Sequence, residues 1–252
     1  MNRPRLTAVM PGLWTADVQM PDFGVRSVAL LGRERMLVFD TLLRPSDMLA
    51  FAELAEGRAV VTVYSHADWD HIWGTAGLPG RGGEIVGHVM CAHRFSADVP
   101  GTLAKMQAEE PGAWDDVELI APTTLVEDSL LLDLGPWTVE LHHAPGHTRD
   151  SVVAWIPDAG VLLGGDAVEE PWPLAGDGLA LGPWIATLRR WESEPGLRSV
   201  IPAHGAIGGP ELLRRNAEYL EALRDGRDYP VPEGTAPFYV DHYHHDQLRY
   251  RS

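Results

Sequence analysis

Short apolar runs separated by polar turns recur along the chain, and several of them stop abruptly at charged residues. The clearest is Val60–Tyr64, in which four β-branched residues precede a tyrosine. β-Branched and aromatic residues favour strands, and a short unbroken apolar run is typical of a strand that is buried. We therefore expect a buried strand here, with its last residue at the edge of a functional site.

The other runs predict alternating strands and helices. Strands are expected at residues 6–18, 84–88 and 137–142, in hairpins over 27–39 and 151–164, and before residue 204. Helices are expected at 45–57, in parts of 94–113 with a break at Pro100-Gly101, at 183–194 and at 210–224. This alternation predicts a layered α/β fold, although it does not by itself distinguish a sandwich from a doubly wound sheet.

The pattern strand, turn, strand, Asp occurs twice, ending at Asp40 and at Asp166. This faint repetition fits a fold made of two similar halves. No linker or low-complexity tract divides the chain, so residues 1–252 are expected to form a single domain. Segments 17–26, 94–118 and 168–182 are expected to form the pocket, with 94–118 as a lid or substrate-facing insertion.

Side chains that could bind a metal are concentrated directly after the strand at residues 60–64. His66, Asp68, Asp70 and His71 fall within six positions. In an extended segment, positions 66, 68 and 70 share one side and His71 points elsewhere, so one strand end could serve two neighbouring metal ions. The alternative is a polar loop that contains its histidines by chance.

Three later strand ends repeat the same sequence of features. Each has a short apolar run, then small residues, then a metal-binding side chain: Pro145-Gly146-His147, Gly165-Asp166 and Ala203-His204-Gly205. Glycine and alanine at such points allow the backbone and a ligand to approach closely. These repetitions favour a metal site over a chance cluster.

These four motifs, in this order, resemble those of the metallo-β-lactamase superfamily. That family has a first motif HxHxDH, a His after Pro-Gly, an Asp after Gly and a late His before Gly, and the likeness spans roughly residues 10 to 210. The resemblance implies an α/β fold, the αβ/βα sandwich, with two mixed β-sheets and helices on the outer faces. One departure stands out: the second His of the first motif is Asp68 here.

The resemblance also implies a ligand set and a reaction. His66, Asp68 and His147 would hold one ion, and Asp70, His71 and His204 a second, with Asp166 between them. The two divalent ions, zinc first and manganese or iron as alternatives, would share a bridging hydroxide that attacks an acyl centre. Asp70 is expected to orient this nucleophile. Asp40 and Thr148 are expected behind the ligands.

Asp68 changes the expected electrostatics of this site. Two divalent ions would be balanced by three aspartates and one hydroxide, whereas a histidine at position 68 would leave one positive charge. An oxygen donor also favours manganese or iron over zinc, and the flavodiiron members of the superfamily carry Glu at this place and bind iron. The other interpretation is that Asp68 binds weakly and the first metal site is only partly occupied.

Three functions follow from these features. The first is a metal-dependent hydrolase of a small ester, lactone, thioester or amide. The second is an iron-dependent oxidoreductase of the same fold, prompted by Asp68. The third is a degenerate, non-catalytic member, which the remaining intact ligands disfavour.

Composition narrows the partners. The formal net charge of −16 disfavours nucleic acid as a partner, because binding to phosphates needs clustered Lys and Arg. No apolar run reaches the length of a membrane span, no secretory signal is visible, and Cys91 is the single cysteine. We therefore expect a cytoplasmic enzyme for a small-molecule substrate, with a homodimer left open.

Three further interpretations concern residues outside the expected ligand set. Asp150 is expected to be a turn residue, while Trp69 and Trp73 either line the pocket or simply pack. The tail 228–252, for which an extended conformation is one alternative, is rich in Tyr and His. It could fold back and offer one of them to a substrate, but a solvated or dimer-contacting tail is the favoured interpretation.

Overall fold

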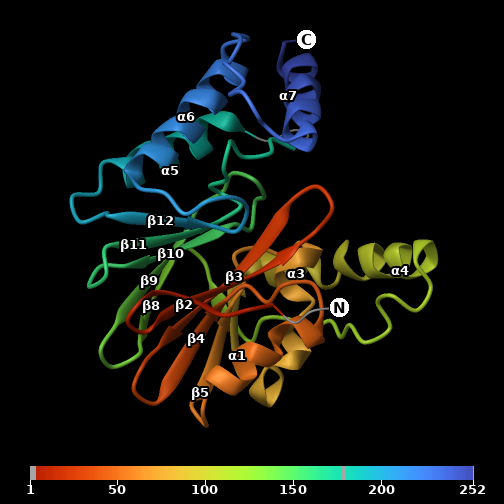
Figure 1. Cartoon of the computed structure of the whole chain (residues 1–252), viewed down its shortest axis with the longest axis vertical. Coiled ribbons are helices and arrows are strands. Elements are labelled where there is room, and N and C mark those ends of the chain that lie inside the picture. Colours follow the sequence, from red (N-terminus) through yellow and green to blue (C-terminus); the bar gives the residue numbers. More distant parts are fainter. Residues whose placement is uncertain (1–3, 177–179, 252) are drawn as a thin grey trace.

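Two β-sheets lie face to face at the centre of the computed structural model, which describes residues 4–176 and 180–251 (Figure 1). The first sheet has seven strands in chain order: β1 (Thr7–Met10), β2 (Leu13–Gln19), β3 (Gly24–Leu31), β4 (Arg35–Phe39), β5 (Ala59–Val63), β6 (Glu84–His88) and β7 (Thr124–Val126). The second has five strands, in the order β12 (Ser199–Pro202), β11 (Val161–Gly165), β10 (Val152–Ile156), β9 (Thr138–His143) and β8 (Ser129–Asp133). Both sheets combine parallel and antiparallel pairs.

The alternation of side chains along each strand explains why these runs are apolar throughout. In β5, Val61 and Val63 enter the core between the two sheets, whereas Val60 packs under the helices on the outer face. In β10, Val152 faces the inner core and Val153 the outer one. Successive side chains point to opposite faces, so a strand covered on both sides needs apolar residues at every position.

Helices cover the outer face of each sheet. The seven-stranded sheet carries α1 (Leu49–Leu54), α2 (Trp69–Ile72), α3 (Val89–Arg94) and α4 (Val99–Glu109), together with the 3₁₀ turns Pro45–Met48, Thr75–Gly77 and Pro79–Gly82. The five-stranded sheet carries α5 (Leu181–Glu192), α6 (Pro210–Arg224) and α7 (Pro237–Tyr250). This order of layers, helices on sheet on sheet on helices, is the αβ/βα sandwich expected from the sequence.

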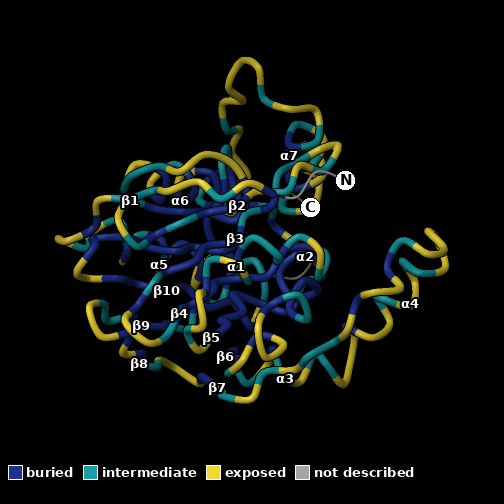
Figure 2. The backbone as a smooth tube through the Cα atoms, turned by 60° about the horizontal axis from the view of Figure 1, so that its bottom comes forward, coloured by how far each residue is buried: buried dark blue, intermediate teal, exposed yellow. Residues whose placement is uncertain are grey.

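Two helical segments differ from the expectation. The helix at 45–57 begins as a 3₁₀ turn and ends at Leu54. Pro100 and Gly101 do not interrupt a helix; they lie in the first turn of α4, where a missing N–H costs nothing, and the break falls at 95–98. Figure 2 shows α4 standing out from the two-sheet body.

The tail is not extended. Residues 237–250 form α7, which begins at Pro237 and buries Tyr239 and Tyr243 in the outer core of the five-stranded sheet. The rings of these two tyrosines lie 6.2 Å and 6.0 Å from the buried ring of Trp172. Burial of large aromatic rings offsets the entropy of ordering the tail, a contribution that a Pro- and His-rich composition does not reveal.

The two halves share one unit of topology. The hairpin β3–β4 is followed by β5 parallel to β4, and the hairpin β10–β11 is followed by β12 parallel to β11. Asp40 directly follows β4, and Asp166 directly follows β11. Within the described residues, none of the helices is long and apolar enough to cross a membrane.

Candidate metal centre

The loop after β5 brings the first motif to the edge where the two sheets meet. Ser65 bridges the sheets, since its carbonyl accepts a hydrogen bond from the Val152 N–H at 2.7 Å. Gly165 takes a positive φ of 51° beside it, and a Cβ there would lie 2.6 Å from that of Ser65. Only glycine permits this approach, which places Asp166 against the histidines of the loop.

The first motif is extended only as far as Asp68. That residue has extended backbone angles and caps α2, which then carries Asp70 and His71 in a helical turn. The prediction that positions 66, 68 and 70 share one side is therefore wrong for Asp70, because the helix rotates its side chain away. His66 and Asp68 lie together, whereas Asp70 lies with His71.

Among the groups of donor atoms that lie within 4.8 Å of one another are two that share no residue. His66, Asp68 and His147 form the first group, and Asp70, His71 and His204 form the second. All are buried or half-buried. The structure thus brings together every residue that the sequence nominates as a ligand.

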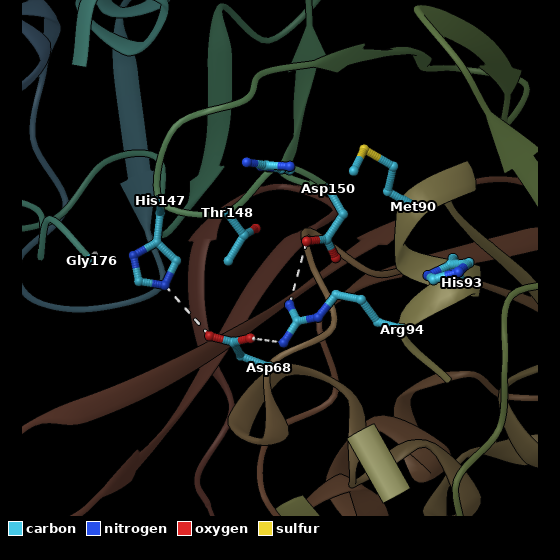
Figure 3. Close-up of a pocket in the computed structure, with 9 residues that line it drawn as sticks. Asp68, Met90, His93, Arg94, His147, Thr148, Asp150 and Gly176 are labelled. Atoms are coloured by element: carbon cyan, nitrogen blue, oxygen red, sulfur yellow. Dashed lines mark hydrogen bonds and ion pairs between the residues drawn. The ribbon is translucent and has the colours of Figure 1, made fainter. Parts of the chain in front are cut away.

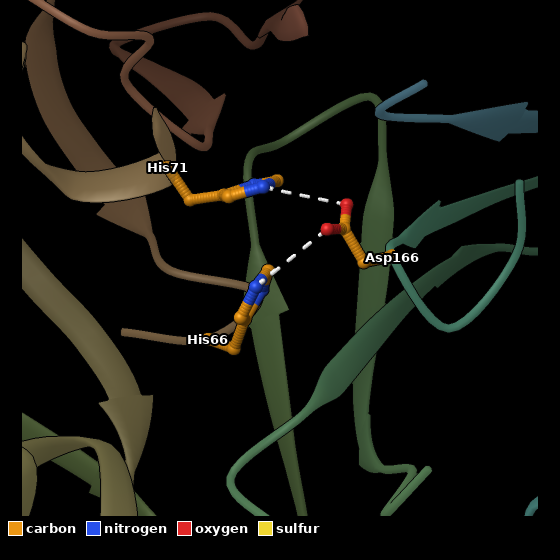
Figure 4. A group of neighbouring side chains, drawn as sticks. All are labelled: His66, His71 and Asp166. Atoms are coloured by element: carbon orange, nitrogen blue, oxygen red, sulfur yellow. Dashed lines mark ion pairs between the residues drawn. The ribbon is translucent and has the colours of Figure 1, made fainter. Parts of the chain in front are cut away.

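Asp166 faces both groups with a different oxygen (Figure 4). Its Oδ2 lies 3.8 Å from Nε2 of His66 and 3.6 Å from Nε2 of His147. Its Oδ1 lies 3.3 Å from Nε2 of His71 and 3.2 Å from Nε2 of His204. One carboxylate therefore spans the two groups, as a ligand shared by two ions would.

Each of the four imidazoles is held from behind through Nδ1. His71 faces Asp40 Oδ2 at 2.9 Å, and His204 and His147 face the carbonyls of Gly24 and Leu174 at 2.7 and 3.2 Å. His66 contacts the Ser65 hydroxyl at 2.9 Å. A carboxylate or carbonyl at Nδ1 accepts a hydrogen bond from Nδ1–H, which fixes the tautomer whose Nε2 lone pair is free for a cation.

Two observations indicate that these residues fit metal ions. Buried Nε2 of His66, buried Nε2 of His71 and buried Oδ1 of Asp166 have no hydrogen-bond partner among the described residues, an arrangement that needs an explanation such as an ion. Donors about 2.1 Å from one tetrahedral ion lie about 3.4 Å apart, and the spacings around Asp166 run from 3.2 to 3.8 Å.

The electrostatics also favour a cation. Burial by itself opposes the charged forms of the histidines. The neighbouring carboxylates nevertheless raise the pKa of His147 to about 9 and that of His204 to about 10. Burial likewise opposes ionisation of Asp166, yet His204 and His71 hold the pKa of that carboxyl well below its usual range. Without a metal the cluster keeps protons that an ion would displace.

The three residues expected near the ligands behave differently from one another. Asp40 contacts His71 and also accepts the Ser65 N–H at 2.7 Å. Thr148 pairs its hydroxyl with that of Ser151 at 2.8 Å rather than with a ligand. Asp150 lies in a turn, as expected, and is also 1% exposed and accepts the Ala67 N–H at 2.9 Å, which fixes the motif loop.

Sequence reasoning missed one acidic and one cationic neighbour of the site. Glu169, buried and three residues after Asp166, offers a donor atom within 4.8 Å of His147 and Asp166. Arg94, at the end of α3, pairs with Asp68 at 2.7 Å. Glu169 lies three residues after a nominated ligand, which is the signal that could have found it. Arg94 is 26 positions from Asp68, and no local pattern reveals that pairing.

Two pockets open on this centre. The smaller, of about 110 Å³, has metal-ligand candidates as its floor and Phe23, Leu174, Phe238 and Tyr239 as its walls. The larger, of about 530 Å³, shares Asp68 and His147 with it and extends past Arg94 and Met90 (Figure 3). The tail therefore folds back to the site, the alternative that was not favoured from sequence.

The two tryptophans of the motif loop do both things considered for them. Trp73 is fully buried, and its ring packs against those of Trp69 and Trp114 at 5.6 and 5.3 Å. Trp69 and Trp73 also line a cavity of about 210 Å³ next to Asp68. Cys91 is buried.

The fold and this centre define the class of protein, and comparison with known proteins agrees. The family described as the metallo-beta-lactamase superfamily matches residues 21–225, so the chain belongs to it. Membership of this superfamily supports a metal-dependent hydrolase in general terms.

Individual relatives are distant. The metallo-beta-lactamase type 2 of Bacteroides fragilis is 25% identical over 108 residues, which cover 41% of this chain and 43% of that protein. A solved metallo-beta-lactamase from Pontibacter korlensis is 18% identical, with a TM-score of 0.70 over 87% of this chain and 99% of its own. FIM-1 from Pseudomonas aeruginosa, solved in a mono-zinc form, is 19% identical, with a TM-score of 0.67 over 87% and 96%. These likenesses establish the αβ/βα fold.

Proposed function

We propose that the chain is a metal-dependent hydrolase that cleaves a small ester, lactone, thioester or amide. The observation that carries this proposal is Asp166, whose two oxygens each face a different pair of imidazole nitrogens at 3.2–3.8 Å. This arrangement fits two ions, zinc first among the candidates, at the floor of a pocket. A dinuclear centre in a pocket is a recurrent device for hydrolysis.

When bound, two such ions would activate a water near neutral pH and would supply a positive field for a developing oxyanion. The chain's own residues supply the positioning. Asp70, which is 6% exposed, faces His71 and His204 at 3.6 and 3.7 Å and lines the pocket. We assign it the orientation of the nucleophile.

The walls of the smaller pocket suit an acyl group. Phe23, Leu174 and Phe238 present apolar surface, and the ring of Phe23 also meets that of His204 at 5.3 Å. Apolar walls exclude water and bind carbon rather than charge. We therefore place the acyl chain of the substrate against these three residues.

Tyr239 is the polar group in these walls. Burial and the charge of Glu169 raise its pKa, so its hydroxyl stays protonated, and it lies 3.3 Å from Glu169 Oε2. Burial and the charge of Asp166 raise the pKa of Glu169 to about 7. In this structure the hydroxyl gives its one proton to Glu169. We propose that it donates to a substrate oxygen instead when Glu169 is protonated and donates to Tyr239.

One observation favours the iron-dependent oxidoreductase as the second candidate. Asp68 in the first group and Glu169 beside His147 add two carboxylates to one side of the centre. Oxygen donors suit iron and manganese better than zinc. This function is the proposal to adopt if iron is the resident metal.

The test is elemental analysis of the purified protein combined with a panel of ester, lactone, thioester and amide substrates. About two zinc or manganese ions per chain and turnover of one substrate class would support the hydrolase. Predominant iron with oxygen consumption would replace it by the oxidoreductase. Two ions without turnover of any class would contradict the hydrolase proposal while leaving the centre intact.

The remaining expectations stay part of the proposal. We place the enzyme in the cytoplasm and give it a small-molecule substrate. The formal net charge of −16 supports the absence of a nucleic-acid partner.

A further inference from the structure

The two oxygens of Asp68 face different partners. Oδ2 points to the first metal group, 3.4 Å from Nε2 of His66 and 3.5 Å from Nε2 of His147. Oδ1 instead lies 2.7 Å from Nη2 of Arg94 (Figure 3). The side chain that departs from the family motif is therefore divided between a metal position and a guanidinium.

Arg94 is itself held from two other directions. On the solvent side, its Nε and Nη2 donate to Asp98, one turn further along, at 3.0 and 2.7 Å. On the buried side, its Nη1 donates to Asp150 Oδ1 at 3.3 Å. The other oxygen of Asp150 accepts the N–H of Ala67, the residue before Asp68. The guanidinium thus joins α3, the motif loop and the loop after His147.

An aspartate at position 68 needs such a partner more than a histidine would. A carboxylate can bind an ion through one oxygen or two, and it carries a charge that adds to that of Asp166. The Asp68 side chain is 30% exposed, so packing alone does not fix its rotamer. A planar guanidinium on Oδ1 occupies that oxygen, leaves Oδ2 for the ion, and offsets the charge.

We propose that Arg94 is a positioning residue that makes Asp68 a one-oxygen ligand, so that the Asp68–Arg94 pair fills the place of a single neutral ligand in the first metal group. Arg94 touches neither the ions nor the substrate in this role; it acts through Asp68. The inference rests on the metal centre of the proposed function and is independent of which bond the enzyme cleaves.

The first experiment measures metal binding by Arg94→Met. Chelator-treated protein is titrated with Zn²⁺ and with Co²⁺. Binding is measured from the heat released and from the absorption bands of bound cobalt. The wild type is expected to bind about two ions. In the variant one ion stays tight and the other weakens about 10- to 100-fold, the usual effect of losing a partner of a metal ligand. Arg94→Lys restores charge without the planar fork and recovers part of the loss.

Two control variants separate positioning from folding. Arg189→Met removes another half-exposed arginine that pairs with two glutamates, Glu192 and Glu221, on the far side of the five-stranded sheet. Asp98→Asn removes the solvent-side partner of Arg94 and leaves the contact with Asp68 in place. Both are expected to bind two ions with wild-type affinity.

The decisive measurement is a double-mutant cycle with Asp68→His. With a neutral imidazole at position 68, removal of Arg94 is expected to change metal affinity by no more than about twofold. An equal loss in both backgrounds would overturn the proposal, because Arg94 would then act on the fold and not through Asp68. Unchanged affinity in Arg94→Met alone would overturn it as well.

These outcomes are distinguishable from failure of the proposed function. If the wild type binds two ions and hydrolyses no member of the panel, only the hydrolase proposal fails, and the cycle still reports on Arg94. If the wild type binds no metal at all, the centre and the inference fail together. If Arg94→Met binds like the wild type while hydrolysis is present, only the inference fails.

Discussion

The two metal groups are built by different means. In the second group the side chains of Asp70, His71 and His204 are all at most 8% exposed, and His71 is backed by Asp40, itself tied to the backbone of Ser65. In the first group only His66 is fully buried: the side chain of Asp68 is 30% exposed and that of His147 is 16% exposed. The first group borders the larger pocket and depends on an ion pair.

This difference indicates how each group is organised. Deeper burial and the Asp40 carboxylate behind His71 hold the second group in place before any ion arrives, which lowers the entropy cost of binding. A half-exposed ion pair is weaker and is screened by salt. We therefore expect the second group to load first and the first group to be the one that a change of residue can tune.

The largest expected effect comes from Asp166→Ala, which removes the carboxylate that both groups share. Occupancy should fall from two ions to one or none, and hydrolysis by at least about a hundredfold. Elemental analysis after dialysis measures the first and initial rates the second. Asp115→Ala, a change at an exposed aspartate, is the control. Retention of two ions would remove Asp166 from its bridging role.

Asp40→Asn tests how the second group is organised. The variant keeps the shape of the side chain but loses the charge that faces Nδ1 of His71. Affinity for the first ion to load should fall about 10- to 100-fold, since the orientation of that imidazole depends on Asp40. Calorimetric titration of the chelator-treated protein measures it. A loss confined to the second ion would reverse our assignment of loading order.

Asp68→His tests how the first group selects its metal. The variant should keep two ions, and the preference for zinc over manganese should rise about tenfold because an imidazole replaces an oxygen donor. Competition between the two metals, read by elemental analysis, measures the shift. If neither metal identity nor affinity responds, Asp68 is not a ligand.

Tyr239→Phe tests the pocket rather than the metals. Loss of one hydrogen bond to a substrate oxygen should lower kcat by about tenfold, with metal content unchanged. Tyr243→Phe is a matched control, because Tyr243 lies on the same helix and packs on Trp172 but does not line the pocket. Equal rates in the two variants would exclude a substrate contact for Tyr239.

The smallest effect is the pH dependence of the metal-free protein. His147 and His204 have their pKa raised to about 9 and about 10, so both hold protons at pH 7. Their contribution to stability is fully present below the unfolded pKa of about 6.5 and is lost as the pH rises through 9 to 10. The metal-free Tm should fall over that range.

Metal binding should show the reciprocal behaviour. Ions displace these protons, so affinity should rise between pH 7 and 9, with proton release visible in titrations that use buffers of different ionisation enthalpy. The metal-loaded protein should keep its Tm over the same range. Binding without proton release would mean that the imidazoles are already neutral at pH 7.

Local pattern was sufficient for much of the fold. The strands around residues 60–64 and 84–88 and the helix at 210–224 follow directly from apolar runs and a helix-starting proline. The short strands β7 and β8 were not predicted, because three to five half-exposed residues give little apolar periodicity. The motif order also sufficed to nominate seven ligand candidates.

What the sequence by itself determined is therefore most of the elements, the family and the residues offered to the metals, since these depend on spacing along the chain. Only the tertiary structure decided the partners of those residues. Arg94 meets Asp68 across 26 positions, Asp40 meets His71 across 31, and Tyr239 meets Glu169 across 70. Such contacts arise from the packing of two sheets and their helices, which no local pattern of residues encodes.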